Sequence, residues 1–435
     1  MKYDLLITDV RRIKLPADVS EACAVAVKDG KIAAILPRDG GNAEARRVIH
    51  GEGKYIIPGL IDLHVHFREP GFEYKEDIAS GSRCAAAGGV TSVFTMPNTK
   101  PVCDNPETLA YIYDKAKDAD CRVFQLAAIT KGLASEEVCD LEALAGAGAA
   151  AFSDDGKPVM TAKLLRDAMK IAAKNDYLIM SHCEDMSLAA GGAINEGKVS
   201  RIMKLRGISN LSEYLAIERD ITVAEETGCR LHICHVSAKE SVEIIRRAKK
   251  RGVRVTAETC PHYFTLTDED VIFYGANAKM NPPLRTSADI KAIIEGLQDG
   301  TLDCISTDHA PHSAEEKSGD IAKAMNGIIG LQTSFIASYT ALVVPGHLTF
   351  AELLMRMSAN PARITGLDKM GLGSLDEGSA ADFALVTLGC ENTVDRDALC
   401  GKSTNTPYVG MTFAARVDAA FVAGNQKFEF KPERK

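Results

Sequence analysis

An alternation of short apolar runs with helical segments fills the middle of the chain and restricts its possible folds more than any other feature. Eight runs of strand length end near His66, Asn98, Thr130, Asp155, Glu184, Ser237, His262 and His312. Segments with helical periodicity lie between most of them, at 106–119, 161–175, 211–227, 239–251 and 288–297. The third unit is the least clear, because its helical segment around Leu141 is rich in Ala and Gly. The pattern predicts an α/β fold whose eight parallel strands close into a (β/α)8 TIM-like barrel.

Both ends of the chain carry a different, β-rich pattern. Apolar runs at 22–27 and 31–36 flank Asp29-Gly30, a dipeptide typical of a two-residue hairpin turn. The C-terminal segment is similar, with a turn at Gly424-Asn425 and runs at 383–387, 414–422 and 427–430. We therefore predict a small composite β-sandwich domain formed from residues 1–57 and 366–435. The barrel domain is expected to span 58–365.

The charge balance excludes two classes of partner. The 435-residue chain has a formal net charge of -8, so no basic excess is present to meet nucleic-acid phosphates or an anionic membrane surface. No uncharged apolar stretch approaches the ~20 residues that span a bilayer, and the N-terminus lacks the apolar segment of a signal peptide. The twelve cysteines are scattered, without a Cys-x-x-Cys pair. We expect a cytoplasmic protein with reduced thiols that binds neither nucleic acid nor membrane.

Histidines cluster at the ends of the predicted strands. His64 and His66 end the first run, and side chains two positions apart in a strand point to the same face. Such a pair can bind one metal ion through its imidazole nitrogens. His182 and His235 end two later runs. His232 lies three residues before His235, on the opposite face, and is predicted to be structural.

Acidic residues complete this set. Asp154 and Asp155 end the fourth run, and Asp308 ends the eighth. Alone, each would more often cap a helix or lie in a solvated loop. Together with the four histidines they converge on one end of the predicted barrel, where the strand ends build the active site. Such a set suits two divalent ions, so the residues indicate a metal-assisted hydrolase acting on a carbonyl or phosphoryl centre.

Four motifs, spread over the chain, carry a resemblance to a known family. They are DLHVHFREP at 62–70, TMPN at 95–98, MNPP at 280–283 and STDHAPH at 306–312, the last followed by Lys317. With them the chain resembles the amidohydrolase superfamily and, within it, the dihydroorotase family. The resemblance covers the whole chain, and the two long motifs are the most specific.

The resemblance implies a ligand for every position of a binuclear centre. One ion would be bound by His64, His66 and Asp308, and the second by His182 and His235. Many relatives bridge the ions with a carboxylated lysine, but here the fourth run ends Ser153-Asp154-Asp155-Gly156, and Lys157 lies past the glycine. This resembles the bacterial class I branch, which bridges with aspartate. Asp155 is the expected bridge and Asp154 the alternative, with two Zn2+ ions expected and other divalent ions tolerated by the same donors.

The resemblance also implies the substrate contacts. The substrate of the family is dihydroorotate, a cyclic imide with a carboxylate, which the Arg68 guanidinium can bind in a two-point fork. Asn98, Asn281 and His312 resemble the remaining contacts, and the backbone at Asn326 and Gly327 can bind ring amide atoms. The charged, Gly-containing segment 313–321 is either a mobile loop over the site or a solvated loop.

The activity implied is the reversible, zinc-dependent hydrolysis of (S)-dihydroorotate to N-carbamoyl-L-aspartate. Run in reverse, it is the ring closure of de novo pyrimidine biosynthesis. A hydroxide that bridges the ions is the expected nucleophile. Asp308 is the expected general acid/base, which takes the hydroxide proton and delivers it to the leaving nitrogen.

Two alternatives remain open. Hydantoinases (dihydropyrimidinases) and allantoinases act on cyclic amides without the ring carboxylate, and Arg68 is the residue that argues against them. The other alternative is a non-catalytic assembly subunit of aspartate carbamoyltransferase, which would be expected to have lost metal ligands. A homodimer, or a complex with aspartate carbamoyltransferase, is expected from the family alone.

Overall fold

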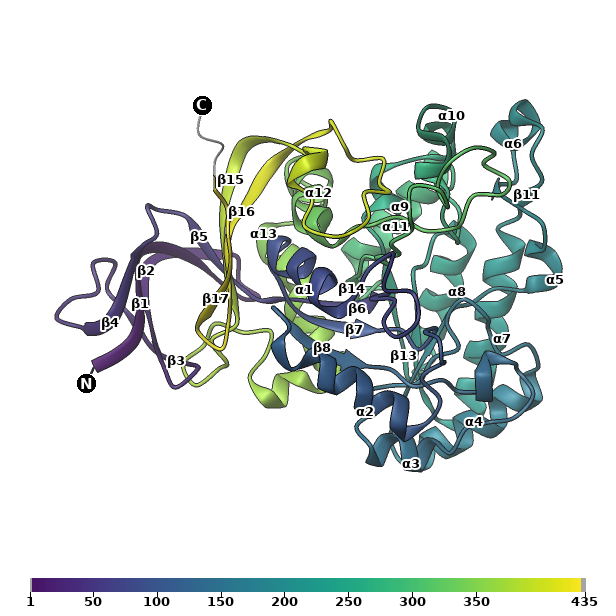
Figure 1. Ribbon diagram of the computed structural model, residues 1–435, viewed down its shortest axis with the longest axis horizontal. Helices are drawn as coiled ribbons and strands as arrows, with labels where there is room; N and C mark the ends of the chain where they lie inside the picture. The colour runs from purple at the N-terminus through teal and green to yellow at the C-terminus, as the bar shows by residue number, and fades with distance from the viewer. Residues whose placement is uncertain (1, 432–435) are drawn as a thin grey trace.

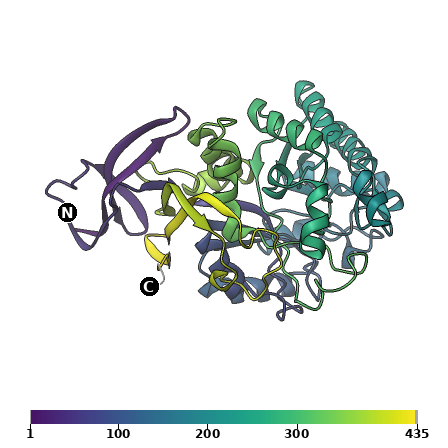
Figure 2. The same ribbon diagram turned by 90° about the horizontal axis from the view of Figure 1, so that it is seen from above.

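The computed structural model describes residues 2–431 and has a mixed α/β fold. The views in Figures 1 and 2 show the N-terminal strands at one end of the molecule and the C-terminal strands beside them. A larger body of strands and helices makes up the rest (Figure 1). Within residues 2–431, none of the helices has both the length and the apolar character needed to cross a membrane.

The two ends of the chain form one eight-stranded sheet. Its strand order is β17-β16-β15-β5-β1-β2-β3, with β4 paired to β1. Asp29 and Gly30 join β2 to β3 and both have positive φ, as the predicted hairpin turn requires. The bounds are β1 Lys2–Lys14, β2 Val19–Lys28, β3 Lys31–Leu36, β4 Glu44–His50, β5 Tyr55–Pro58, β15 Phe383–Thr393, β16 Thr412–Val422 and β17 Asn425–Glu429.

This sheet corrects the prediction of a sandwich. Strand β5 pairs with β1 on one side and with β15 on the other, so the hydrogen bonding runs through both ends of the chain without a break. The sheet bends until Gly424 lies over Val27, where an added Cβ would approach that side chain to 2.8 Å. Phe383 and Phe421 stack inside the bend with ring centroids 4.6 Å apart. One bent sheet thus encloses the apolar cluster that two sheets were expected to enclose.

The body contains two larger parallel sheets, besides the two-stranded parallel pair of β10 Ile194–Asn195 and β11 Gly207–Ile208. One has the order β6-β7-β8 and the other β14-β13-β12-β9. The predicted fourth strand is reduced to Phe152, which bridges to Ala127 after β8 and to Ile179 in β9. A further parallel bridge joins Val65 to His309. The bounds are β6 Leu60–Val65, β7 Val90–Thr95, β8 Arg122–Gln125, β9 Leu178–Ser181, β12 Arg230–Ile233, β13 Val255–Thr259 and β14 Cys304–Ile305.

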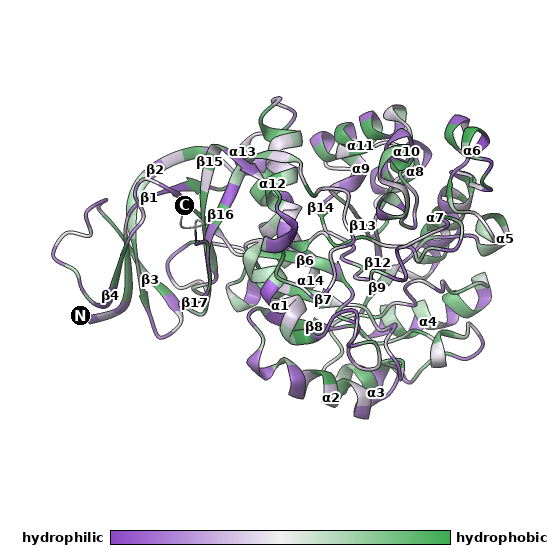
Figure 3. Ribbon diagram, turned by 45° about the horizontal axis from the view of Figure 1, so that its top comes forward, coloured by the Kyte–Doolittle hydropathy of each residue, from purple (hydrophilic) through white to green (hydrophobic). Residues whose placement is uncertain are grey.

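Helices follow most of these strands where the periodicity predicts them. The five matching helices are α2 Pro106–Lys115, α4 Ala162–Lys174, α7 Leu211–Thr227, α8 Lys239–Lys250 and α11 Ser287–Asp299. The Ala/Gly-rich segment forms only the short α3, Leu141–Gly146. Figure 3 shows hydrophobic residues concentrated on the central strands, whereas the surrounding helices carry both hydrophobic and hydrophilic residues. The remaining elements of the body are α1 Ile78–Ala87, α5 Met186–Ala189, β10 Ile194–Asn195, α6 Lys198–Met203, β11 Gly207–Ile208, α9 His262–Thr265, α10 Val271–Tyr274, α12 Ser334–Ser338, α13 Phe350–Leu354 and α14 Asn360–Thr365.

Candidate metal centre

Two histidines at the end of β6 lie side by side, as their spacing predicts. The ring centroids of His64 and His66 are 5.4 Å apart. Nε2 of His64 lies 3.2 Å from Oδ1 of Asp155 and 3.6 Å from Oδ1 of Asp308. Nε2 of His66 lies 3.1 Å from the same oxygen of Asp308. The first pair of histidines therefore faces both acidic residues.

A second pair of histidines lies on the other side of Asp155. His182 follows β9 and His235 follows β12, and Nδ1 of His182 is 2.8 Å from Nε2 of His235. Oδ1 of Asp155 lies 3.5 Å from that Nδ1 and 3.8 Å from that Nε2. The four imidazoles thus surround one carboxylate, because the parallel strands that carry them end at the same edge.

The donor atoms of this cluster fit a divalent cation. His64 Nε2 and Asp155 Oδ1 are buried, and neither has a hydrogen-bond partner among the described residues. Leaving such atoms unpaired costs about 1–3 kcal/mol each, so native proteins rarely do it without a ligand. Ligand atoms of His64, His66 and Asp308 lie within 4.8 Å of one another, and so do those of His64, Asp155 and His235. Imidazole and carboxylate donors in such groups suit zinc and similar ions.

The two neighbouring aspartates of the fourth run have different surroundings. Asp154 accepts hydrogen bonds from the backbone N–H groups of Ile129 and Thr130, at 2.7 and 3.0 Å, and from the Thr130 hydroxyl. Burial raises the pKa of Asp154 to about 6. Burial also raises the pKa of Asp155, but the charge of His64 and the adjacent imidazoles of His182 and His235 outweigh it and hold that pKa well below the usual value. Only Asp155 faces the histidines.

Three residues of the cluster have a left-handed backbone. Arg68, His235 and Asp308 have φ values of 62°, 38° and 48°. Non-glycine residues rarely adopt this region, and such strain of about 1–3 kcal/mol per residue concentrates at functional sites. The strained backbone directs these three side chains into the same space.

A cavity of about 310 Å³ opens beside the histidines. All the predicted site residues except the fully buried His64 line it. Its lining comprises His66, Arg68, Asn98, Asp155, Gly156, His182, His235, Asn281, Asp308, Ala310, His312, Ala324, Met325, Asn326 and Gly327.

The cationic side of the cavity is formed by Arg68 and His312. Nε of Arg68 donates to the carbonyl of Pro311 at 3.2 Å, and its terminal nitrogen lies 3.4 Å from Nε2 of His312. That Nε2 lies 2.8 Å from the carbonyl of Asn326, while Nζ of Lys75 approaches Nδ1 at 3.3 Å. Burial and the charges of Arg68 and Lys75 lower the pKa of His312, so its ring is neutral and donates to Asn326. The guanidinium is the cation left facing the cavity.

Of the two predicted asparagines, Asn98 contacts the histidine and aspartate cluster directly and Asn281 contacts Glu184 beside it. Oδ1 of Asn98 lies 2.9 Å from Nδ1 of His66, and its amide donates to Asp155 at 3.3 Å. The amide of Asn281 donates to Oε2 of Glu184 at 3.0 Å, and its own oxygen is buried with no partner among residues 2–431. Glu184 lies 3.4 Å from Nε2 of His182 and was not predicted as a site residue. Its position two residues after the candidate ligand His182 could have pointed to it.

The segment after β14 contributes a wall of the cavity. Nζ of the buried Lys317 donates to the carbonyls of Lys279, Met325 and Gly327 at 3.0, 2.9 and 2.8 Å. Burial lowers the pKa of Lys317 to about 7. Glu316 forms an ion pair with Lys75 at 2.8 Å. Lys317 therefore ties the predicted loop 313–321 to the cavity wall, while residues 314–315 and 318–320 of the loop are exposed to solvent.

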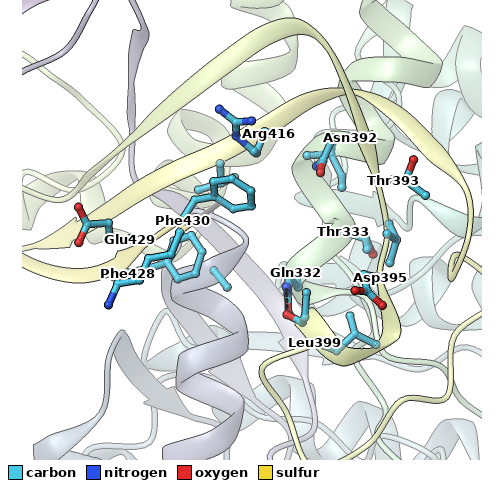
Figure 4. Close-up of a pocket in the computed structure, with 16 residues that line it drawn as sticks. Gln332, Thr333, Asn392, Thr393, Asp395, Leu399, Arg416, Phe428, Glu429 and Phe430 are labelled. Atoms are coloured by element: carbon cyan, nitrogen blue, oxygen red, sulfur yellow. Dashed lines mark hydrogen bonds between the residues drawn. The ribbon is translucent and has the colours of Figure 1, made fainter. Parts of the chain in front are cut away.

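A second cavity, of about 340 Å³, lies between the C-terminal strands and α12 (Figure 4). The guanidinium of Arg416 lies over the ring of Phe430, 4.5 Å from its centroid, and Gln332 donates to the carbonyl of Ala398 at 2.9 Å. None of the 16 described residues that line this cavity is a histidine or a cysteine. It therefore lacks the donors that distinguish the first cavity.

Four buried histidines and two carboxylates at the ends of parallel strands define a class of protein, the metal-dependent hydrolases with an α/β fold. Solved structures of the same overall fold include the L-hydantoinase (dihydropyrimidinase) from Arthrobacter aurescens, with a TM-score of 0.88, 26% identity and coverage of 98% of this chain and 96% of that one. The dihydropyrimidinase from Brevibacillus agri NCHU1002 shares the fold with a TM-score of 0.83, 22% identity and coverage of 97% and 94%.

Sequence comparison identifies the family more narrowly. A family model described as "Dihydro-orotase-like" matches residues 53–241. The dihydroorotase of Acetivibrio thermocellus is 48% identical over 87% of this chain and 88% of the relative. The dihydroorotase of Trichlorobacter lovleyi is 45% identical over 98% of this chain and 99% of the relative. The chain belongs to the dihydroorotase family.

Proposed function

We propose that this protein is an enzyme that interconverts (S)-dihydroorotate and N-carbamoyl-L-aspartate by hydrolysing and closing the cyclic amide. The observation that carries the proposal is the juxtaposition of Arg68 with the histidine and aspartate cluster in one cavity. A guanidinium matches a carboxylate, and dihydroorotate carries its carboxylate on the ring that is cleaved. The curated dihydroorotases at 45–48% identity support this choice over the hydantoinases at 22–26%.

The fold proposal is a closed (β/α)8 barrel spanning 58–365, next to a domain made from 1–57 and 366–435. The bridges through Phe152 join β8 to β9, and the bridge between Val65 and His309 joins β6 to the segment after β14. These pairings connect both edges of the two parallel sheets, as a closed barrel requires. The strand ends of such a barrel carry the active site of the enzymes built on it.

The proposed ligands are those of a binuclear centre. His64, His66 and Asp308 would bind one divalent ion, and His182 and His235 a second, with Asp155 between them. Zn2+ is the proposed metal, because imidazole and carboxylate are among its usual ligands. When bound, such ions supply Lewis acidity for the scissile carbonyl and lower the pKa of water.

The remaining side chains have roles that follow from their positions. Arg68 binds the substrate carboxylate, and Asn98, Asn281, His312 and the backbone at 326–327 hold the ring. Asp308 takes the proton of the attacking water and delivers it to the leaving ring nitrogen. Hydrogen bonding to His66 and the nearby imidazole charges outweigh burial and lower the pKa of Asp308 to about 2, so its carboxylate is ionised and ready to accept a proton. A cytoplasmic location and a homodimer, alone or with aspartate carbamoyltransferase, are proposed on the family resemblance.

Parallel assays with dihydroorotate, hydantoin and allantoin test the substrate proposal. We expect kcat/KM for dihydroorotate to be at least about 100-fold higher, because the other two rings offer no carboxylate to the half-buried guanidinium of Arg68. Each substrate is assayed with the same metal-loaded preparation, so that differences in metal content cannot produce the preference. A preference for hydantoin or allantoin would overturn the proposal.

Removal of divalent ions with a chelator is expected to reduce turnover by more than about 1,000-fold, since both the carbonyl and the attacking water would lose their activation. Adding back Zn2+ should restore it, and metal analysis of the active preparation should find about two ions per chain, as a two-metal site predicts. Full activity in a metal-free preparation would contradict the metal role. A chain purified without metal and inactive after Zn2+ addition would favour the non-catalytic assembly subunit.

A further inference from the structure

A buried carboxylate lies behind His64, on the side away from the cavity. Glu258 of β13 is fully buried, and its Oε1 lies 3.3 Å from Nδ1 of His64. The other ring nitrogen of His64, Nε2, faces Asp155 and Asp308. The imidazole of His64 therefore stands between the proposed metal position and Glu258.

This placement determines which tautomer of His64 can bind a cation. A neutral imidazole carries its proton on one nitrogen and its lone pair on the other. The lone pair must be on Nε2, which faces the acidic cluster, so the proton must be on Nδ1 and needs an acceptor there. The thiol of Cys234 also lies within 4.8 Å of His64 and Glu258 ligand atoms, but sulfur is a weak acceptor. Oε1 of Glu258, 3.3 Å from Nδ1 and without another partner among the described residues, is the strong acceptor on that side.

Glu258 is itself held in place from its other side. Its Oε2 lies 3.2 Å from Nε2 of His232 and accepts a hydrogen bond from the hydroxyl of Ser306. Nδ1 of His232 lies 2.8 Å from the hydroxyl of Thr256, so Nε2 is the ring nitrogen that faces Glu258. A carboxylate this deep costs several kcal/mol unless such partners compensate it.

We propose that Glu258, anchored by His232 and Ser306, is a positioning residue that fixes the tautomer and orientation of His64 for metal binding. The inference rests on metal binding by His64, but it is independent of which cyclic amide the enzyme hydrolyses. Carboxylates behind metal-binding histidines raise ligand basicity, and their loss typically weakens metal binding by about 10- to 100-fold. The role also gives a function to His232, which lines no part of the 310 Å³ cavity.

The test compares Glu258→Gln with the wild-type chain and with Asp382→Asn. Glutamine preserves the shape of the side chain and removes its charge. Asp382, just before β15, is a buried carboxylate paired with Arg122 at 2.7 Å and lies outside the cavity lining, so its substitution disturbs an ion pair without touching the histidines. The metal-free proteins are titrated with Co2+ and with Zn2+ against a competing chelator, and the visible spectrum of bound Co2+ reports its coordination.

We expect Glu258→Gln to bind Co2+ and Zn2+ about 10- to 100-fold more weakly and to change the Co2+ spectrum. Asp382→Asn should lower the unfolding temperature while its metal affinity and spectrum match those of the wild-type chain. His232→Gln keeps Glu258 but removes the imidazole that holds it, so it should weaken metal binding and change the Co2+ spectrum in the same direction by a smaller factor. This variant also tests the proposal if Glu258→Gln does not fold. Wild-type metal affinity and spectrum in every folded variant would overturn the proposal. A wild-type chain that binds no metal would overturn it together with the proposed metal centre, whereas a changed substrate preference would leave it intact.

Discussion

Replacing Asp308 with asparagine is expected to reduce kcat by about 1,000-fold, because a positioned general acid/base contributes about 100- to 10,000-fold. The amide of asparagine has nearly the shape of the carboxylate but cannot accept and return a proton at neutral pH. Oδ1 of Asp308 lies 3.1 Å from His66, so the amide oxygen can retain that position. The measurement is steady-state kcat at saturating dihydroorotate, together with the metal content of the same sample.

The control for this variant is Asp154→Asn. Asp154 is also buried, but its hydrogen bonds go to residues 129–130 and not to the histidines. That substitution should lower the unfolding temperature and leave kcat within about threefold of wild type, since it removes a buried hydrogen-bond network away from the reacting atoms. Near-normal turnover of Asp308→Asn with both metals bound would show that another group transfers the proton.

Replacing Arg68 with methionine is expected to lower kcat/KM for dihydroorotate by about 100- to 1,000-fold, mainly through KM. The loss corresponds to a two-point, charge-assisted contact with the substrate carboxylate. Arg68→Lys should recover only part of it, because an ammonium group preserves the charge but not the planar fork. Steady-state kinetics of the three proteins, with equal metal content, measure both effects.

A substrate without the carboxylate separates this contact from a general disturbance of the site. Dihydrouracil has the same ring and lacks only that group. Wild type and Arg68→Met should hydrolyse dihydrouracil at similarly low rates, so the effect of the substitution should disappear with the carboxylate. An equal loss on both substrates would mean that Arg68 supports the cavity, through its contacts to Pro311 and His312, and does not recognise the carboxylate.

Local signals predicted much of the secondary structure. Five helices begin and end within a few residues of the periodic segments, because apolar spacing and caps such as Asn105 and Thr161 are properties of contiguous residues. The hairpin at Asp29-Gly30 followed from the positive φ that its turn type needs. The fourth strand did not form as expected. Its apolar run is short, and only Phe152 pairs with the neighbouring segments.

The candidate site also has some features that the sequence predicted and others that it did not. The identity of the donors could be read from the sequence, since spacing of two in a strand places His64 and His66 on one face. The choice of Asp155 over Asp154 rested on the family resemblance alone, because the contacts that turn Asp154 toward Thr130 exist only in the folded chain. Glu184 and Glu258 were missed for a related reason. Glu184 lies beside His182, which is two residues before it in the chain. Glu258 lies beside His64, which is on a different strand, β6.

By itself the sequence determined the elements, the donor chemistry and the family, because these depend on residue type and on spacing along a continuous stretch of chain. Only the tertiary structure decided that both ends share one bent sheet, that Asp155 lies among four histidines, and that Glu258 lies behind His64. These three facts depend on strand order and register, which join residues far apart in the chain. Pairing of that kind is determined by the packing of the whole molecule, so no local pattern contains it.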